Sequence, residues 1–160
     1  YTIYTNLHTN TAYSSLAAQV TKIFPITLNT FIIPTIYGRF IFNDGIPFMY
    51  SNVIGGEGYN PHYEQQIPFS GLTHTESTLK LLGNAQIQVR HKFHEKQYLT
   101  LSGNYAIHQN QFSNFLQGKK IYGTSIGYGY DSPLGPIEGF ICYSNRTNKL
   151  GFYLNIGFGF

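Results

Sequence analysis

The last residues of the chain alternate strictly between apolar side chains and small or polar ones. From Lys149 to Phe160, every second position is apolar, and the positions between them hold glycine, tyrosine and asparagine. The apolar set is Leu150, Phe152, Leu154, Ile156, Phe158 and Phe160. Because successive strand residues point to opposite faces of a sheet, this period of two predicts one long β-strand over 149–160.

The same alternation recurs in the preceding part of the chain. It is found in segments 79–91, 99–108, 120–130 and 137–144. In the first of these, Ala85, Ile87 and Val89 share one face, and Asn84, Gln86 and Gln88 share the other. Polar or turn-forming segments at Phe93–Lys96, Asp131–Gly135 and Asn145–Asn148 separate the predicted strands.

The first half of the chain is less regular. Segment 1–5 is expected to be the remnant of a strand, segment 13–24 a strand, and Pro25 a short turn. Segment 27–42 reads as a long strand that is apolar on both faces, and the glycine- and proline-rich stretch 43–71 as a long loop. The pattern therefore predicts an all-β chain with about seven to eight strands.

The amino-acid composition argues against several other classes of protein. Only 11% of the 160 residues are charged, against about 25% in an ordinary soluble domain. The ten Lys and Arg residues are scattered and form no basic stripe, so we expect no nucleic-acid partner. A single cysteine, Cys142, excludes a disulfide scaffold. The most apolar stretch, 31–42, is interrupted by Pro34, Thr35, Gly38 and Arg39, which argues against a membrane-spanning helix.

The polar faces of the predicted strands indicate which solvent surrounds them. They hold glycine, serine, threonine, asparagine and glutamine rather than charges, and the strands are as long as tilted membrane strands. An apolar outside and a polar inside are typical of an antiparallel transmembrane β-barrel. A soluble ligand-binding barrel, the remaining alternative, would need an apolar interior. We therefore expect Leu154, Ile156 and Phe158 to face lipid, with Asn84 and Gln86 inside.

Two motifs suggest chemistry but fit a structural role better. Gly123-Thr-Ser125-Ile-Gly127 matches the G-x-S-x-G pattern of lipases, yet it lies within an alternating strand and no helix follows it. We interpret Ser125 as a lumen-facing residue. His91 and His94 flank a strand end and are expected to be rim residues. The sequence thus predicts no catalytic, cofactor-binding or metal-binding residue in this chain.

The inward polar residues allow two interpretations. They are Lys80, Gln86, Gln88, Arg90, His108 and Glu138. They are expected to form a ladder of hydrogen bonds that fills a narrow lumen, with the lining of an open pore as the alternative. Cys142 is expected to be an inward thiol without a reactive role.

The C-terminal strand resembles the recognition signal with which bacterial outer-membrane barrels end. That signal has a polar residue, a glycine two positions later, alternating hydrophobic residues and a terminal aromatic. Here these are Lys149, Gly151, Leu154, Ile156, Phe158 and Phe160. The resemblance implies that the barrel assembly machinery recognises this strand.

The preceding hairpin is similar to that of the bacterial surface antigen (BamA/TamA) superfamily of sixteen-stranded barrels. The resemblance is carried by the turn at Pro133, Gly135 and Pro136. Further back, Gly55, Gly56, Gly58 and Tyr59 occupy the place of the long inward-folded loop of that family. Glu57 stands where the family has arginine, which argues against a role as the insertase itself.

The diverged loop looks most like barrels fused to patatin-like phospholipases in Bacteroidetes. That resemblance implies that residues 1–160 are the C-terminal half of a barrel in the outer membrane of a Gram-negative bacterium. The half-barrel would anchor, and display or export, an upstream lipid hydrolase, and the rest of its barrel or a second copy would complete it. The alternative is an autonomous eight-stranded barrel with a structural or adhesion role.

Overall fold

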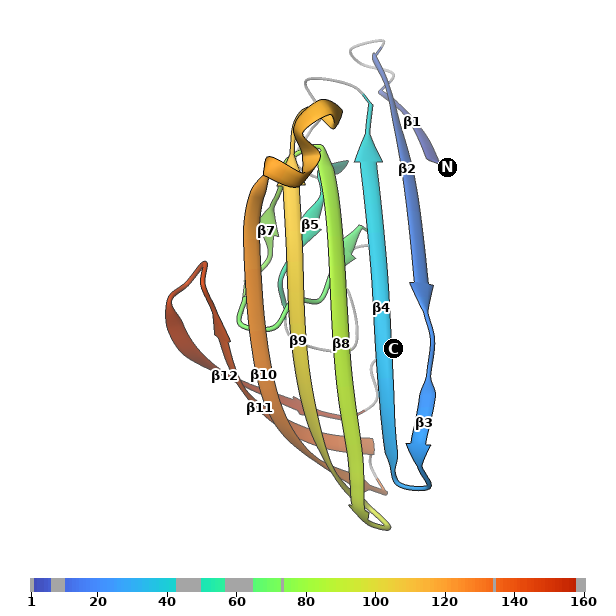
Figure 1. The fold of residues 1–160 in the computed structure, drawn as a ribbon, viewed down its shortest axis with the longest axis vertical. Coiled ribbons are helices and arrows are strands. Elements are labelled where there is room, and N and C mark those ends of the chain that lie inside the picture. The colour runs from blue at the N-terminus through green and yellow to red at the C-terminus, as the bar shows by residue number, and fades with distance from the viewer. Residues whose placement is uncertain are drawn as a thin grey trace.

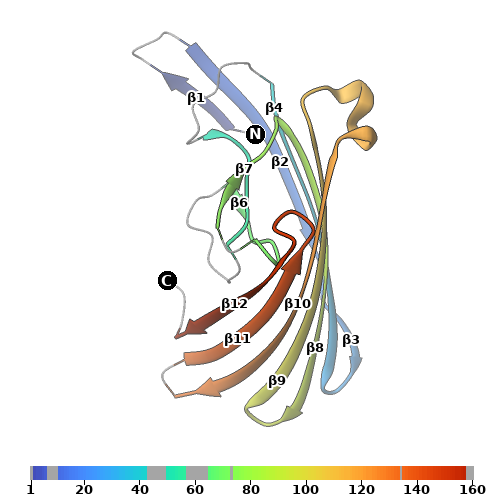
Figure 2. The ribbon, with the colours of Figure 1, turned by 90° about the vertical axis from the view of Figure 1, so that its left-hand side faces the viewer.

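The chain folds as a curved antiparallel sheet with a smaller sheet on its concave side (Figures 1 and 2). The computed structural model describes residues 2–6, 11–42, 50–56, 65–72, 74–133 and 135–157. No helix within these ranges is long and apolar enough to cross a bilayer.

Eight strands follow one another across the large sheet, each antiparallel to its neighbours. In order, they are β1 (Thr2–Asn6), β2 (Thr11–Thr21), β4 (Thr30–Ile41), β8 (Leu81–His94), β9 (Gln97–Gln109), β10 (Lys119–Ser132), β11 (Gly135–Ser144) and β12 (Lys149–Ile156). A ninth strand, β3 (Phe24–Thr27), pairs with β4 beyond the end of β2. The predicted all-β antiparallel fold is thereby confirmed.

The small sheet lies within the connection between β4 and β8. It contains β5 (Val53–Ile54), β6 (Gln66–Ile67) and β7 (Glu76–Ser77) in the order β6-β5-β7. The 3-10 segment η2 (Phe112–Gln117) joins β9 to β10. The inward-folded connection is therefore longer than the predicted loop 43–71, and it has secondary structure of its own.

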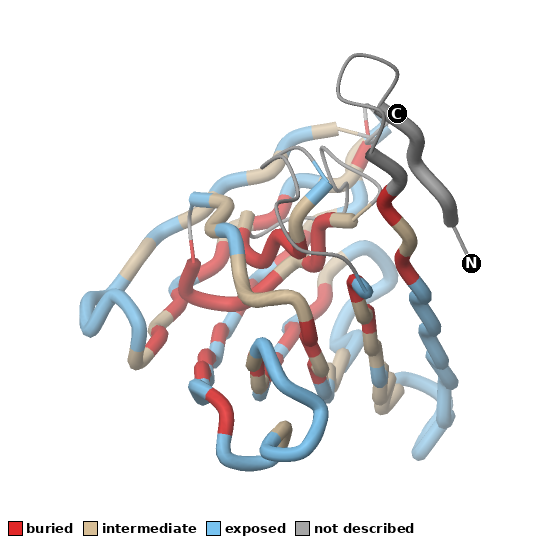
Figure 3. Tube along the Cα trace, turned by 90° about the horizontal axis from the view of Figure 1, so that it is seen from above, coloured by how far each residue is buried: buried red, intermediate tan, exposed pale blue. Residues whose placement is uncertain are grey.

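The two faces of the large sheet have the predicted polarity. Ile126, Ile141 and Leu154 point away from the concave side and are 48%, 54% and 54% exposed, respectively. Asn84, on the concave face, is only 3% exposed. Buried and exposed positions alternate along the strands, and buried segments gather inside the curve (Figure 3). Since exposed apolar side chains in contact with water would be costly over so large an area, the outer face is suited to lipid.

The turn predicted at Pro25 is wrong. Pro25 lies within β3 and pairs with Phe31 of β4, and the turn falls at residues 28–29. Proline lacks an N–H donor, so strands tolerate it at sheet edges and irregularities. Both conditions hold here, because β3 pairs only with β4 among the described strands and the register shifts between Pro25 and Thr27.

The connections differ in length between the two ends of the sheet. At one end, β3 joins β4 through residues 28–29, β8 joins β9 through residues 95–96, and β10 joins β11 through residues 133–134. At the other end, the connections whose residues are described include the long one between β4 and β8, the η2 segment, and the turn at residues 145–148. In outer-membrane barrels the short turns are periplasmic and the long loops extracellular, a pattern that favours the extracellular side for η2.

Candidate functional site on the inner wall

The concave face of the large sheet is covered by the connection between β4 and β8. We call its described residues, 50–56, 65–72 and 74–79, the inward loop. Four of its buried apolar side chains form a cluster, namely Ile54, Ile67, Phe69 and Leu72. They pack against Leu82, Ala106 and Ile121 on three neighbouring strands of the wall. This apolar core lies on the side that the strand pattern predicts to be polar, because the loop supplies its own apolar residues.

A cluster of three serines joins the inward loop to the wall. The Ser70 hydroxyl lies 2.9 Å from that of Ser102 on β9 and 3.2 Å from that of Ser125 on β10, and the latter two are 2.6 Å apart. The Asn104 amide donates to the carbonyl of Pro68 at 3.4 Å. These bonds satisfy buried polar groups of both partners, which would otherwise cost free energy.

Gly123 allows the loop to approach this closely. A Cβ atom at Gly123 would lie 1.9 Å from the carbonyl oxygen of Ser70. That distance is far below any van der Waals contact, so the wall can hold only a glycine here while the loop keeps its position.

Arg39 fastens the stem of the loop. Its guanidinium is buried on β4 and donates to the Ser51 carbonyl and the Asn52 side chain, both at 3.3 Å. The buried amide of Asn52 in turn donates to the carbonyls of Leu79 and Lys80, at 2.9 and 2.8 Å. The first and last residues of the inward loop are thus tied together and to the wall.

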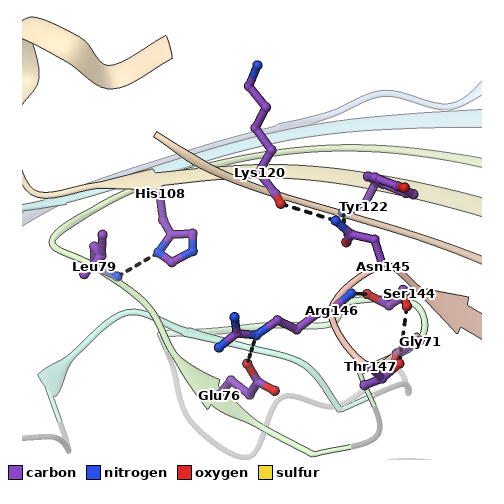
Figure 4. Close-up of polar contacts among 10 residues, drawn as sticks. All are labelled: Gly71, Glu76, Leu79, His108, Lys120, Tyr122, Ser144, Asn145, Arg146 and Thr147. Atoms are coloured by element: carbon purple, nitrogen blue, oxygen red, sulfur yellow. Dashed lines mark hydrogen bonds and ion pairs between the residues drawn. The ribbon is translucent and has the colours of Figure 1, made fainter. Parts of the chain in front are cut away.

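The turn between β11 and β12 holds the loop from the other side (Figure 4). Arg146 pairs with Glu76 at 3.1 Å, and the Thr147 hydroxyl donates to the Gly71 carbonyl at 3.4 Å. On β9, Nδ1 of His108 accepts the backbone N–H of Leu79 at 3.2 Å. The loop is therefore fixed at its stem, in its middle and along its last residues.

Nearer the short turns, the inner wall carries a buried polar cluster. The Tyr98 hydroxyl donates to the carboxylate of Glu138 at 2.6 Å, and Glu138 is only 2% exposed. Arg90 lies 3.7 Å from the same carboxylate oxygen and 4.6 Å from the centre of the Tyr98 ring. Glu138 thus has an interior hydrogen bond as predicted, whereas Arg90 contributes an ion pair and a ring contact.

Tyr98→Phe is expected to destabilise the barrel by about 1–3 kcal/mol, because it leaves a buried carboxylate oxygen without its closest donor. The comparison is Tyr105→Phe on the same strand, whose ring is 43% exposed on the outer face and which should change stability by less than about 0.5 kcal/mol. Urea unfolding in lipid vesicles measures both. Equal stabilities for the two variants would contradict a role for the Tyr98–Glu138 bond.

The described residues of the predicted assembly signal lie on β12. Lys149 and Gly151 pair with Ser144 and Cys142, so they belong to the inner face. Leu154 and Ile156 point outward, 54% and 68% exposed. Phe158 and Phe160 lie outside the residues that the structure describes.

The loop motif and the penultimate turn are only partly described. Gly55 and Gly56 lie in the inward loop with positive φ, 107° and 73°, whereas Gly58 and Tyr59 fall outside the described ranges. Pro133 lies in the turn between β10 and β11, and Gly135 and Pro136 begin β11. Among the described residues, Gly55 and Gly56 thus belong to the inward loop, Pro133, Gly135 and Pro136 to the hairpin of β10 and β11, and the assembly signal to β12.

Ser125, His91 and His94 lie where the strand pattern predicts. Ser125 is in the middle of β10 on the inner face, hydrogen-bonded to the other two serines. His91, near the end of β8, lies with Nδ1 2.8 Å from the Thr30 hydroxyl, and His94 is the last residue of that strand. Over the ranges described, no three His, Cys, Asp or Glu residues gather as a metal site.

The residues that hold the inward loop are not identified by the sequence pattern. Arg39 interrupts an apolar stretch, and an arginine at such a position could have indicated a buried polar partner. Ser70 and Asn52 stand in a glycine- and proline-rich segment with no periodicity, so nothing in the sequence pairs them with the wall.

An apolar outer face, a polar inner wall and a loop folded against that wall define a membrane β-barrel with an occupied lumen side. The family model of the OMP85 superfamily matches residues 1–160, and the chain belongs to that superfamily of outer-membrane β-barrels. A search of curated proteins found no match.

Proposed function

We propose that this chain is the membrane anchor of a bacterial outer-membrane protein whose upstream part is a patatin-like lipid hydrolase. The observation that carries the proposal is the inward loop, fastened to the wall through Arg39, Ser70 and Glu76. A loop held in this way occupies the concave side of the sheet. An occupied interior is expected of a membrane anchor rather than of an open pore. The link to a patatin-like domain rests on the resemblance of the loop and of the last hairpin.

The same proposal assigns the chain to one half of a sixteen-stranded barrel. The large sheet ends at β1 and β12, and pairing between these two strands is not part of the described sheet. In lipid, unpaired strand edges leave backbone groups without hydrogen bonds, which the bilayer cannot supply. We propose that further strands of the same barrel pair with these two edges. The alternative is that a second copy of this chain pairs with them.

The barrel assembly machinery is the second partner that we propose. Leu154 and Ile156 present an apolar outer face on β12, and Lys149 and Gly151 lie on its inner face. This arrangement supports the resemblance to the C-terminal recognition signal that ends at Phe160.

The anchor proposal is tested by sequencing the complete gene and by locating the activity of the protein that it encodes. We expect the reading frame upstream of Tyr1 to encode a patatin-like domain, and the lipid hydrolase activity to sediment with outer membranes. A protease site introduced between the two parts should release the activity on cleavage and leave the barrel in the membrane.

Two results would count against the anchor. A reading frame without an upstream domain would favour the autonomous eight-stranded barrel. Hydrolase activity that leaves the membrane before cleavage would show that the barrel does not hold it.

A further inference from the structure

The η2 segment lies on the convex, outer side of the sheet, at the end that carries the longer connections (Figure 2). Its two phenylalanines contact aromatic residues of β4 and just beyond it. Phe112 lies 5.5 Å from Phe40 and 6.5 Å from Phe42, measured between ring centres, and Phe115 lies 6.4 Å from Phe40. The segment therefore folds down over the wall instead of projecting away from it.

The contact surface of η2 on the wall is tight. A Cβ atom at Gly83 would lie 3.0 Å from the end of the Phe115 ring. Leu81, whose register with Phe40 puts it on the outer face, is only 1% exposed. Thus η2 covers the outer face of β4 and β8 at this end of the barrel and replaces lipid there.

Although η2 packs on the wall, several apolar side chains at this contact remain exposed. Leu116 is 75% exposed, and Phe112 and its ring partner Phe42 are 59% and 51% exposed. On the outer face of β10, which begins two residues after η2 ends, Lys120 and Tyr122 are also exposed. Exposed aromatic, leucine and lysine side chains at one end of a barrel are typical of the boundary between acyl chains and headgroups, where lysine reaches the polar layer.

We propose that η2 is an interfacial anchor, whose Phe112 and Leu116 side chains insert among the lipids of the outer leaflet just below the headgroups. The occupant is lipid because Phe112 contacts Phe40 on the outer face of β4, so the exposed side chains of η2 adjoin the wall that faces lipid. The polar residues of the segment, such as Ser113 and Gln117, are exposed beside them and suit the headgroup layer. The role goes beyond anchoring an upstream domain and does not depend on it.

Tryptophan fluorescence tests this placement, because the 160 residues contain no tryptophan. Leu116→Trp is introduced into the full-length protein, which is reconstituted into phosphatidylcholine vesicles brominated either near the glycerol ester or near the chain end. Spectra are taken as differences from the unsubstituted protein. We expect blue-shifted emission that is quenched more strongly by bromine near the ester.

Two matched variants provide the reference values for quenching. Ile126→Trp, in the middle of the outer wall, should be quenched most by bromine near the chain end, and Glu95→Trp, in a short exposed turn, by neither lipid. Quenching of Leu116→Trp no stronger than that of Glu95→Trp, or strongest at the chain end, would overturn the proposal. Loss of quenching in Ile126→Trp would overturn it too, together with the lipid-facing wall.

Discussion

Replacing Gly123 with valine is expected to force the inward loop off the wall. The Cβ atom would lie 1.9 Å from the backbone oxygen of Ser70, which cannot rotate away as a side chain could. The loop must move, and the hydroxyl bonds of Ser70 to Ser102 and Ser125 are then lost. Overpacking alone costs about 1–3 kcal/mol, and the broken bonds add to it.

Limited proteolysis of the inserted protein measures this displacement. Gly123→Val should open the inward loop to cleavage, and the unfolding midpoint in urea should fall. The control is Gly103→Val on β9, where an added Cβ would meet nothing within 4 Å. Equal protection of the loop in both variants would mean that close contact at Gly123 does not hold it.

Ile126→Arg is expected to destabilise the inserted barrel by roughly 2–4 kcal/mol, the cost of a charge on the lipid face near the bilayer midplane. Ile126 lies in the middle of β10 and is 48% exposed on the outer face. If this face met water instead, arginine would be tolerated, since exposed charges on soluble proteins cost little.

The matched control lies on the same strand and the same face. Tyr130 is two residues from the end of β10, where the cost of arginine should fall to about 0–1 kcal/mol. Urea titration in vesicles compares Ile126→Arg with Tyr130→Arg. The lipid-facing assignment fails if the two substitutions cost the same.

The strand pattern predicts the faces of the sheet because it is a local property. Ile87 and Asn84 lie on opposite faces of β8 for the same reason that they alternate in the sequence, and no knowledge of distant residues is needed. The outward exposure of Leu154 and Ile156, and the burial of Asn84, therefore follow the prediction.

The inward loop and its contacts depend instead on residues far apart in the chain. Ser70 meets Ser125, which is 55 positions away, and Arg146 meets Glu76, which is 70 positions away. No periodicity links such pairs. The prediction of a turn at Pro25 is wrong for a related reason. Proline usually ends a strand, but a strand tolerates it where the pairing is irregular, and that irregularity depends on the partner strand.

The position of η2 could not be predicted either. Phe112 and Leu116 lie in a connection without hydrophobic periodicity, and the place of the segment on the outer wall depends on the distant Phe40 of β4. Local alternation in the sequence therefore predicts the wall of the sheet. The positions of the inward loop and of η2 are known only from the folded structure.

The most direct test of the lipid-facing wall is a nuclear Overhauser measurement on methyl-labelled protein in lipid nanodiscs. Methyl groups of Ile126, Ile141 and Leu154 should show cross-peaks to lipid acyl chains, and those of Ile54 and Leu82 should show none. Acyl-chain contacts at Ile54 and Leu82, with water contacts at Ile126 and Leu154, would contradict the account.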